Sequence, residues 1–153
     1  MPKSFFQEFL DQLAPLYGMR ALRPDKMGAC QLLLKKENLL VLFEYDDHVV
    51  PNTVLASVPL GEVLAGNEKQ IMKELLKGNQ KSENVLSMQP DEPICFLHRR
   101  LSSSIAGEEL KKSLASFTGA AKKWIEKVGN PERAFDEQEE SSKAGQIFPY
   151  KKV

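Results

Sequence analysis

The sequence lacks an excess of either charge. Its 21 lysines and arginines balance 21 aspartates and glutamates, so the formal net charge at neutral pH is zero. Without a net positive charge, the chain has no strong field to attract nucleic acid or anionic lipid. Its apolar runs are also short, because none approaches the roughly 20 residues that a membrane-spanning helix needs. We therefore expect neither nucleic-acid binding nor membrane insertion.

The sequence also lacks the features of a secreted protein. Its opening segment, residues 4–16, carries Gln7 and Asp11 among apolar residues, so it is amphipathic, whereas a signal peptide has a uniformly apolar centre. There are only two cysteines, Cys30 and Cys95, and each lies within an apolar, strand-like run. We interpret them as buried, reduced thiols rather than as a disulfide. These features predict a cytoplasmic protein.

Residues with catalytic or metal-binding chemistry are scarce and scattered. His48 and His98 are the only histidines, and neither has a second histidine or a cysteine at the spacing of metal ligands. The serines at 102–104 lack a nucleophile-elbow pattern and are better explained as the cap of the last helix. The pair Asp46–Asp47 is typical of a solvated turn rather than of acid–base catalysis or calcium binding. Because a glycine-rich phosphate loop is also absent, we expect no enzyme, no cofactor and no metal.

What the chain does contain is a regular succession of helical and strand patterns. Apolar residues at three- and four-residue spacing predict helices over 4–16, 68–77 and 110–128. Short apolar runs bounded by turn residues predict strands over 30–35, 39–45, 53–58, 84–88 and 94–100. The order α-β-β-β-α-β-β-α predicts the α+β class, with three helices on an antiparallel sheet of about five strands.

The last residues differ in composition from the rest. Residues 132–143 are charged and almost without apolar side chains, which predicts disorder. We therefore divide the chain into a domain at 1–130 and a flexible charged tail at 131–153. The tail ends on apolar and basic residues from Ile147 to Val153. Our hypothesis is that this end docks on an apolar groove, its own or a neighbour's, while no partner is bound. The alternative is a disordered terminus.

The predicted strand at 39–45 is apolar on both faces. Leu40 and Leu42 lie on one face, and Leu39, Val41 and Phe43 lie on the other. A strand with one solvated face would alternate with polar residues. Three helices of these lengths are too few to cover both faces of the sheet. Either one helix crosses to the second face or a partner covers it, and the periodicity does not decide between them. An uncovered apolar patch would be an interaction surface.

Several local patterns occur in a fixed order between residues 4 and 128. They are the opening amphipathic helix, Gly28–Leu32 at the entry to the first strand, Phe43–Tyr45 at the end of the second, Pro59–Gly61 at the exit from the third, Leu75–Asn79 at the end of the second helix, and Leu110, Leu114, Phe117, Ala121 and Trp124 on the last helix. In this order and spacing the chain resembles the class I type III secretion chaperones, the family that includes the chaperone of the translocated intimin receptor.

The resemblance implies a homodimer in the bacterial cytoplasm. Such chaperones bind an extended, non-globular segment of one or more secreted effector proteins and keep it stable and competent for secretion. The implied partners are the effector, a second copy of the chain, and the secretion ATPase or sorting apparatus. These chaperones do not hydrolyse ATP, which agrees with the missing phosphate loop. Their cargo fills apolar grooves and adds a strand to the sheet, which agrees with strands that are apolar on both faces.

Carried over by position, the resemblance implies two surfaces. The cargo-binding residues would be Phe5, Phe9, Leu13, Leu33, Val41 and Phe43. The dimer interface would contain Ile71, Met72, Leu75, Ile94 and Phe96. For each of these residues, packing in the protein's own core is an equal alternative. The chain departs from the family in one respect, because the family is usually acidic and this chain is formally neutral.

The main alternative function is a small-molecule-binding or regulatory α+β module without catalysis. Such a module needs an enclosed pocket with a few convergent polar groups. The predicted strands supply few polar residues for one. Neither the identity of the effector nor the strand face that meets it follows from the sequence.

Overall fold

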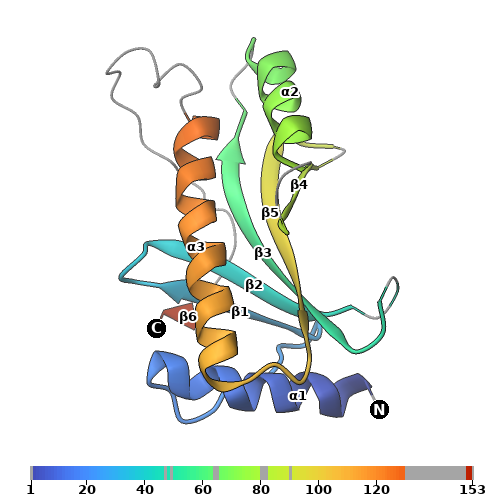
Figure 1. Ribbon diagram of the computed structural model, residues 1–153, viewed down its shortest axis with the longest axis vertical. Coiled ribbons are helices and arrows are strands. Elements are labelled where there is room, and N and C mark those ends of the chain that lie inside the picture. The colour runs from blue at the N-terminus through green and yellow to red at the C-terminus, as the bar shows by residue number, and fades with distance from the viewer. Residues whose placement is uncertain are drawn as a thin grey trace.

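The computed structural model describes residues 2–46, 48, 50–63, 66–79, 83–89, 91–129 and 151–152. It contains three α-helices and one mixed sheet (Figure 1). The α+β class and the order of elements are confirmed, with one short strand added at the C-terminal end. In this described part of the chain, no helix is both long and apolar enough to cross a membrane.

Helix α1 (Pro2–Leu13) ends before residue 16, the predicted end of the first helix, and Pro15 explains the difference. Pro15 has no amide proton to donate to the carbonyl of Asp11, and the chain tightens there into a 3-10 turn, η1 (Ala14–Tyr17). Gly18 closes this turn in the left-handed conformation, at φ 68°. The buried stripe of α1 consists of Phe6, Phe9, Leu10 and Leu13.

Five strands pair antiparallel in the order β4-β5-β3-β2-β1. Their bounds are β1 (Ala29–Leu34), β2 (Leu39–Tyr45), β3 (Thr53–Glu62), β4 (Val85–Met88) and β5 (Ile94–Ser102). The sixth strand, β6 (Lys151–Lys152), pairs parallel to β1 and completes that edge. The predicted disorder of 132–143 and the domain boundary at residue 130 fall outside the described residues.

Strand β3 is longer than the sequence predicts. The strand was expected to end at Val58, with Pro59–Gly61 as its exit, but it continues to Glu62 with an irregular register between Pro59 and Gly61. Strand β2 pairs with β3 only as far as Ser57. Beyond that point β3 is an edge on the β2 side, where a proline without an amide donor is tolerated. Pairing with β5 therefore maintains β3 as a strand as far as Glu62.

Helix α2 (Glu68–Asn79) includes the two residues, Gly78 and Asn79, that were expected to stop it. Helix α3 (Gly107–Gly129) begins later than the serines at 102–104, so their predicted role as its cap is wrong. They form a turn instead, because Ser102 Oγ accepts a hydrogen bond from the amide of Ser104 at 3.3 Å. Hydroxyl groups of this kind compete for backbone donors in turns as readily as at helix ends.

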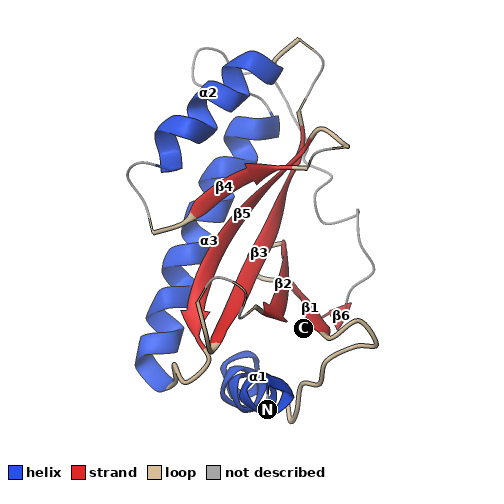
Figure 2. Cartoon of the chain, turned by 90° about the vertical axis from the view of Figure 1, so that its right-hand side faces the viewer, coloured by secondary structure: helices blue, strands red, loops and turns tan. Residues whose placement is uncertain are grey.

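All three α-helices pack on one face of the sheet, which we call the inner face. Phe43 of β2 lies opposite Ala56 of β3, which lies opposite Arg99 of β5, so the three share a face. Phe9 of α1 packs on Phe43 with ring centroids 5.7 Å apart. Arg99 donates a hydrogen bond to the carbonyl oxygen of Ser113 in α3. The buried residues of α2 belong to the same core cluster, and Figure 2 shows α2 and α3 on one side of β3, β4 and β5.

The opposite face, which we call the outer face, has no helix over it in the part of the chain that the structure describes. The strand register aligns one residue from each antiparallel strand in a row across this face: Gln31, Leu42, Ser57, His98 and Val85. Leu33, Leu40, Leu55 and Phe96 lie on the same face in neighbouring rows. Of the two possibilities left open by periodicity, a helix that crosses to the second face is not found among these residues.

Candidate functional site

The outer face is apolar although no described helix covers it. Leu33, Leu42 and Leu55 are half-buried there. Leu40 and Phe96 are buried, yet they do not belong to the cluster that forms the core. The sequence therefore predicts correctly that β2 is apolar on both faces. An apolar face of this kind on a helix-backed sheet is a candidate surface for a protein partner.

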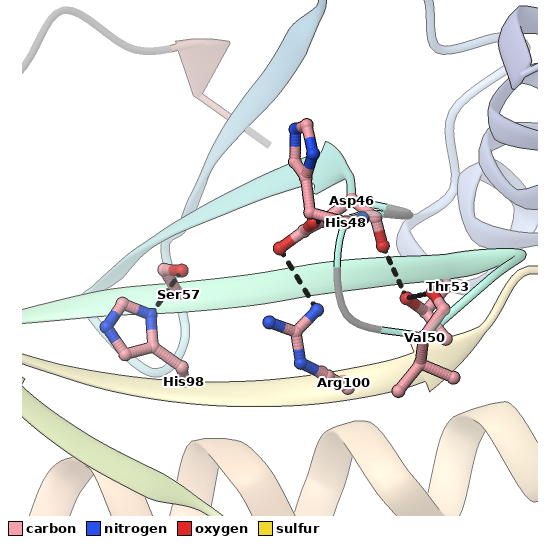
Figure 3. A network of polar contacts seen from close by, with 7 residues as sticks. All are labelled: Asp46, His48, Val50, Thr53, Ser57, His98 and Arg100. Atoms are coloured by element: carbon pink, nitrogen blue, oxygen red, sulfur yellow. Dashed lines mark hydrogen bonds and ion pairs between the residues drawn. The ribbon is translucent and has the colours of Figure 1, made fainter.

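A histidine ties three strands together on the outer face. Nδ1 of His98 lies 2.7 Å from Ser57 Oγ (Figure 3), and Nε2 lies 2.7 Å from Ser87 Oγ. Burial lowers the pKa of His98, and the nearby Arg100 guanidinium lowers it further. The neutral ring has one N–H, so it donates to one serine and accepts from the other. The ring of Phe96 stacks on it with centroids 5.9 Å apart.

This serine–histidine contact does not form a hydrolytic site. A catalytic histidine has one nitrogen on the nucleophile and the other on a carboxylate that orients the ring. Here both nitrogens of His98 contact serines, and Ser57 is buried. Within the described ranges, no group of three or more histidine, cysteine, aspartate or glutamate side chains could hold a metal ion.

An ion pair borders the outer face at the end of β2. Arg100 donates to Asp46 Oδ2 at 3.0 Å, and Asp46 Oδ1 accepts from the amide of His48 at 3.1 Å (Figure 3). The His48 amide, together with Arg100, lowers the pKa of Asp46. Burial and the Asp46 charge raise the pKa of Glu44. The hydroxyl of Thr53 lies within hydrogen-bond distance of the carbonyl oxygen of Asp46. These contacts give Asp46 a structural role in the turn.

The six predicted cargo-binding residues divide into two groups. Phe9, Leu13, Val41 and Phe43 are fully buried where α1 packs on β2. A partner reaches them only if α1 moves away from the sheet, so packing in the protein's own core accounts for them. Phe5 is 37% exposed and Leu33 is half-buried on the outer face. Cargo contact at all six positions stays a prediction, and only these two are accessible as the chain stands.

The predicted dimer residues also divide. Ile71 and Leu75 are buried in the core, and Ile94 and Phe96 are buried at the far end of β5. Met72 alone is well exposed, at 50%. The dimer role of these five residues likewise stays a prediction.

Two further exposed apolar residues were not assigned to the predicted dimer interface. Leu76 is 67% exposed on α2, and Val85 is 55% exposed on β4, the edge strand beside which α2 packs (Figure 1). Helix α2 carries two apolar stripes, since Ile71 and Leu75 face inward while Met72 and Leu76 face outward. The signal was present in the sequence, because four apolar residues within 71–76 cover more than one face of a helix.

The described residues form two open hollows along α3, of about 340 Å³ beside η1 and about 580 Å³ beside β4 and β5. The larger one reaches Arg99, whose Nε donates to Asn84 Oδ1 at 2.6 Å and whose Nη1 donates to the Ser113 carbonyl oxygen at 2.9 Å. Arg99 therefore holds β5 to α3 rather than presenting a charge to a ligand. Neither hollow is the enclosed pocket that the small-molecule alternative needs.

One comparison with known proteins identifies a family. The sequence matches the family model of the Tir chaperone protein (CesT) family over residues 8–125. No curated protein matches the chain significantly.

Three solved structures contain a chain whose fold is similar to that of this protein. In the ExsC–ExsE complex the TM-score is 0.64 at 15% identity, over 82% of this chain and 95% of that one. In the HopA1–SchA chaperone–effector complex it is 0.64 at 14% identity, over 81% and 95%. In the Yersinia pestis type III secretion chaperone SycH with a stable fragment of YscM2 it is 0.57 at 18% identity, over 81% and 99%.

Proposed function

Because this chain belongs to the Tir chaperone protein (CesT) family, we propose that it is a type III secretion chaperone of the bacterial cytoplasm. It binds an extended, non-globular segment of a secreted effector and keeps that segment competent for secretion. The observation that carries this proposal is the apolar outer face, over which the described chain places no helix. The chaperone–effector complex of HopA1 and SchA, which contains a chain of this fold, supports it.

The outer face suits an extended polypeptide better than a folded partner. Its half-buried residues Leu33, Leu42 and Leu55 come from three neighbouring strands, so they offer a shallow apolar surface instead of a deep pocket. An extended segment can place alternate apolar side chains on such a surface and add its backbone to a sheet edge. The segment loses chain entropy when it binds, so a large apolar contact is required. Binding of this kind needs no nucleotide.

We also propose that two copies associate through the end of the molecule that carries α2 and β4. Met72, Leu76 and Val85 are each at least half exposed there. Exposed large apolar side chains favour association, and a two-fold symmetric dimer places the same surface on both subunits. Leu76→Glu should therefore convert the dimer to a folded monomer in light scattering, whereas Lys73→Glu on the same helix should not. A wild-type chain that is already monomeric would exclude this interface.

Co-expression tests the function directly. The chain is produced with N-terminal segments of candidate secreted proteins, and retained complexes are sized by light scattering. We expect two copies of the chain with one segment, and we expect the bound segment to lack a compact fold by hydrogen exchange. Leu42→Glu on the outer face should abolish retention, whereas Lys112→Glu on the solvent side of α3 should not. A chain that retains no segment would contradict the proposal.

A further inference from the structure

The C-terminal end of the chain forms part of the sheet. In β6, Lys151 lies opposite Leu32 and Lys152 lies opposite Leu33, in a parallel arrangement with β1. Figure 1 shows β6 in red beside β1, at the edge of the sheet away from β4. Residues far apart in the sequence are therefore side by side, and β6 occupies the side of β1 that β2 does not use.

The sequence of β1 makes this edge a ready acceptor for a strand. Edge strands are usually protected against further pairing by a charged side chain, a proline or a very short length. Strand β1 is six residues long and contains neither a charge nor a proline, whereas β4 at the opposite edge has four residues. Side-chain oxygen Oε1 of Gln31 is also buried without a hydrogen-bond partner among the described residues. A buried acceptor of this kind favours an arriving donor.

From these observations we infer that the edge of β1 is a strand-addition site that the chain's own C-terminus occupies when no partner is bound. The extended segment of a partner must then displace Lys151 and Lys152 to pair with β1. This inference rests on the proposed function, and it adds a means of control to it. The occupant is short, with only two residues in register, and short terminal pairings open at little cost. The C-terminus thus shields the edge from unwanted pairing and yields to a longer strand.

The occupant also sets the apparent affinity for a partner. When a site is free in only a fraction of molecules, the apparent dissociation constant equals the intrinsic one divided by that fraction. If the C-terminus occupies the edge nine-tenths of the time, its removal strengthens binding about tenfold.

A disulfide trap tests which chain supplies the occupant. Leu33 and Lys152 are register partners, and neighbouring strands lie about 4.8 Å apart, within the range that a disulfide spans. Oxidised Leu33→Cys/Lys152→Cys should form a link within one chain, visible as a faster band at monomer mass on a non-reducing gel. The control pair Lys112→Cys/Lys152→Cys, in which Lys112 lies on α3 and outside the sheet, should not form this link. A link between two chains would overturn the inference, because the occupant would then come from a second copy. Equal linking in both pairs would also overturn it.

Hydrogen exchange tests the pairing in the full-length chain. Lys151→Pro/Lys152→Pro removes both amide donors, so exchange should rise in a peptide that covers residues 29–35. Lys151→Ala/Lys152→Ala removes the charges but keeps the backbone donors, so exchange should stay at the wild-type level. Unchanged exchange in the proline variant would refute the pairing. An equal rise of exchange in the alanine variant would also count against it, because the protection of β1 would then depend on the lysine charges and not on the backbone donors.

Partner binding separates this inference from the proposed function. The probe is the secreted segment retained in the co-expression test. The proline variant should bind it about tenfold more tightly, and the oxidised cysteine pair should bind it weakly until a reductant is added. If all variants bind the segment equally, the inference is wrong and the chaperone function stands. If no variant binds a segment, the proposed function fails, and the trap and the exchange experiment still decide whether the C-terminus occupies the edge.

Discussion

The two faces of β2 carry the same kind of side chain but meet different surroundings. Val41 and Phe43 point to the inner face and belong to the core, whereas on the outer face Leu42 is half-buried and Leu40 is buried outside the core cluster. Leucine, valine and phenylalanine all favour burial, so composition does not distinguish the faces. Among the described residues, the helices cover only the inner face. The apolar composition of a strand therefore reflects its burial in the complete assembly. Part of that burial can come from a partner and not from the chain itself.

The largest expected effect comes from truncating neighbouring residues of β2. Phe43→Ala removes a ring that packs on Phe9, and truncation of a buried phenylalanine costs about 3–5 kcal/mol of unfolding free energy. Leu42→Ala removes a half-buried side chain from the outer face, so it should cost about 1 kcal/mol or less and weaken partner binding instead. Urea denaturation measures the loss of unfolding free energy in each variant. Equal losses of stability would show that something in the free chain covers the outer face as fully as α1 covers the inner one.

The two consecutive arginines of β5 give the second test. Arg99 is buried on the inner face, with hydrogen bonds to Asn84 and Ser113. Arg99→Met leaves these groups without their donor, which should cost about 3 kcal/mol. Arg100 lies on the outer face in a partly exposed ion pair with Asp46, and Arg100→Met should cost about 0–1 kcal/mol. Thermal unfolding of the two variants checks the contrast, and a larger loss for Arg100→Met would reverse our assignment of the faces.

Two glycines provide a smaller contrast between the packed side and the solvent side of the helices. A Cβ atom at Gly78 would lie 2.7 Å from both Leu86 Cδ1 and Trp124 Cζ2. Gly78→Ala should therefore destabilise the fold by about 1–3 kcal/mol through overpacking. A Cβ atom at Gly119 in α3 meets nothing within 4 Å, so Gly119→Ala should stabilise the helix by up to about 1 kcal/mol. Denaturation midpoints of the two variants should move in opposite directions, and a stable Gly78→Ala would mean that α2 shifts freely against α3.

Much of this fold follows from local sequence patterns. The presence of helix α1, the bounds of β2 and the two-sided apolarity of β2 are all predicted correctly. These features depend on residues within one or two turns of each other, where spacing and backbone chemistry act directly. The length of β3 is not predicted, because whether a strand continues past Pro59 depends on where β2 stops pairing with it.

The parts of the site that depend on distant residues could not be predicted. Strand β6 consists of two lysines and pairs with Leu32 and Leu33, and nothing in its local sequence specifies a strand or a register. Burial of Phe9 and Val41 depends on which face of β2 meets α1. The resemblance assigned cargo contacts to whole elements, and alternate residues of one strand point to opposite faces.

The smallest expected effect is the contribution of His98, on the outer face, to the pH dependence of stability. Burial, aided by Arg100, holds the pKa of His98 below its ordinary value of about 6.5. As the pH falls below 6.5, the unfolded chain takes up a proton before the folded chain does, so folding loses stability. The loss should begin near pH 6.5 and continue down to the lowered pKa, and it should be absent above pH 7. His98→Gln, which keeps a donor and an acceptor, should flatten this slope between pH 7 and 5.

His48→Gln in the exposed loop provides the matched control for this measurement. The pH-dependent contacts of His98 are with Ser57 and Ser87, both on the outer face. If His98→Gln retains the wild-type slope, the acid sensitivity arises elsewhere. Glu44 does not supply it, because burial raises the pKa of that carboxyl, so its protonation at lower pH favours the folded chain. If the slope disappears, the outer face holds β3, β4 and β5 together through a neutral imidazole. Its apolar surface is then ordered before any partner arrives, unlike a loop that folds on binding.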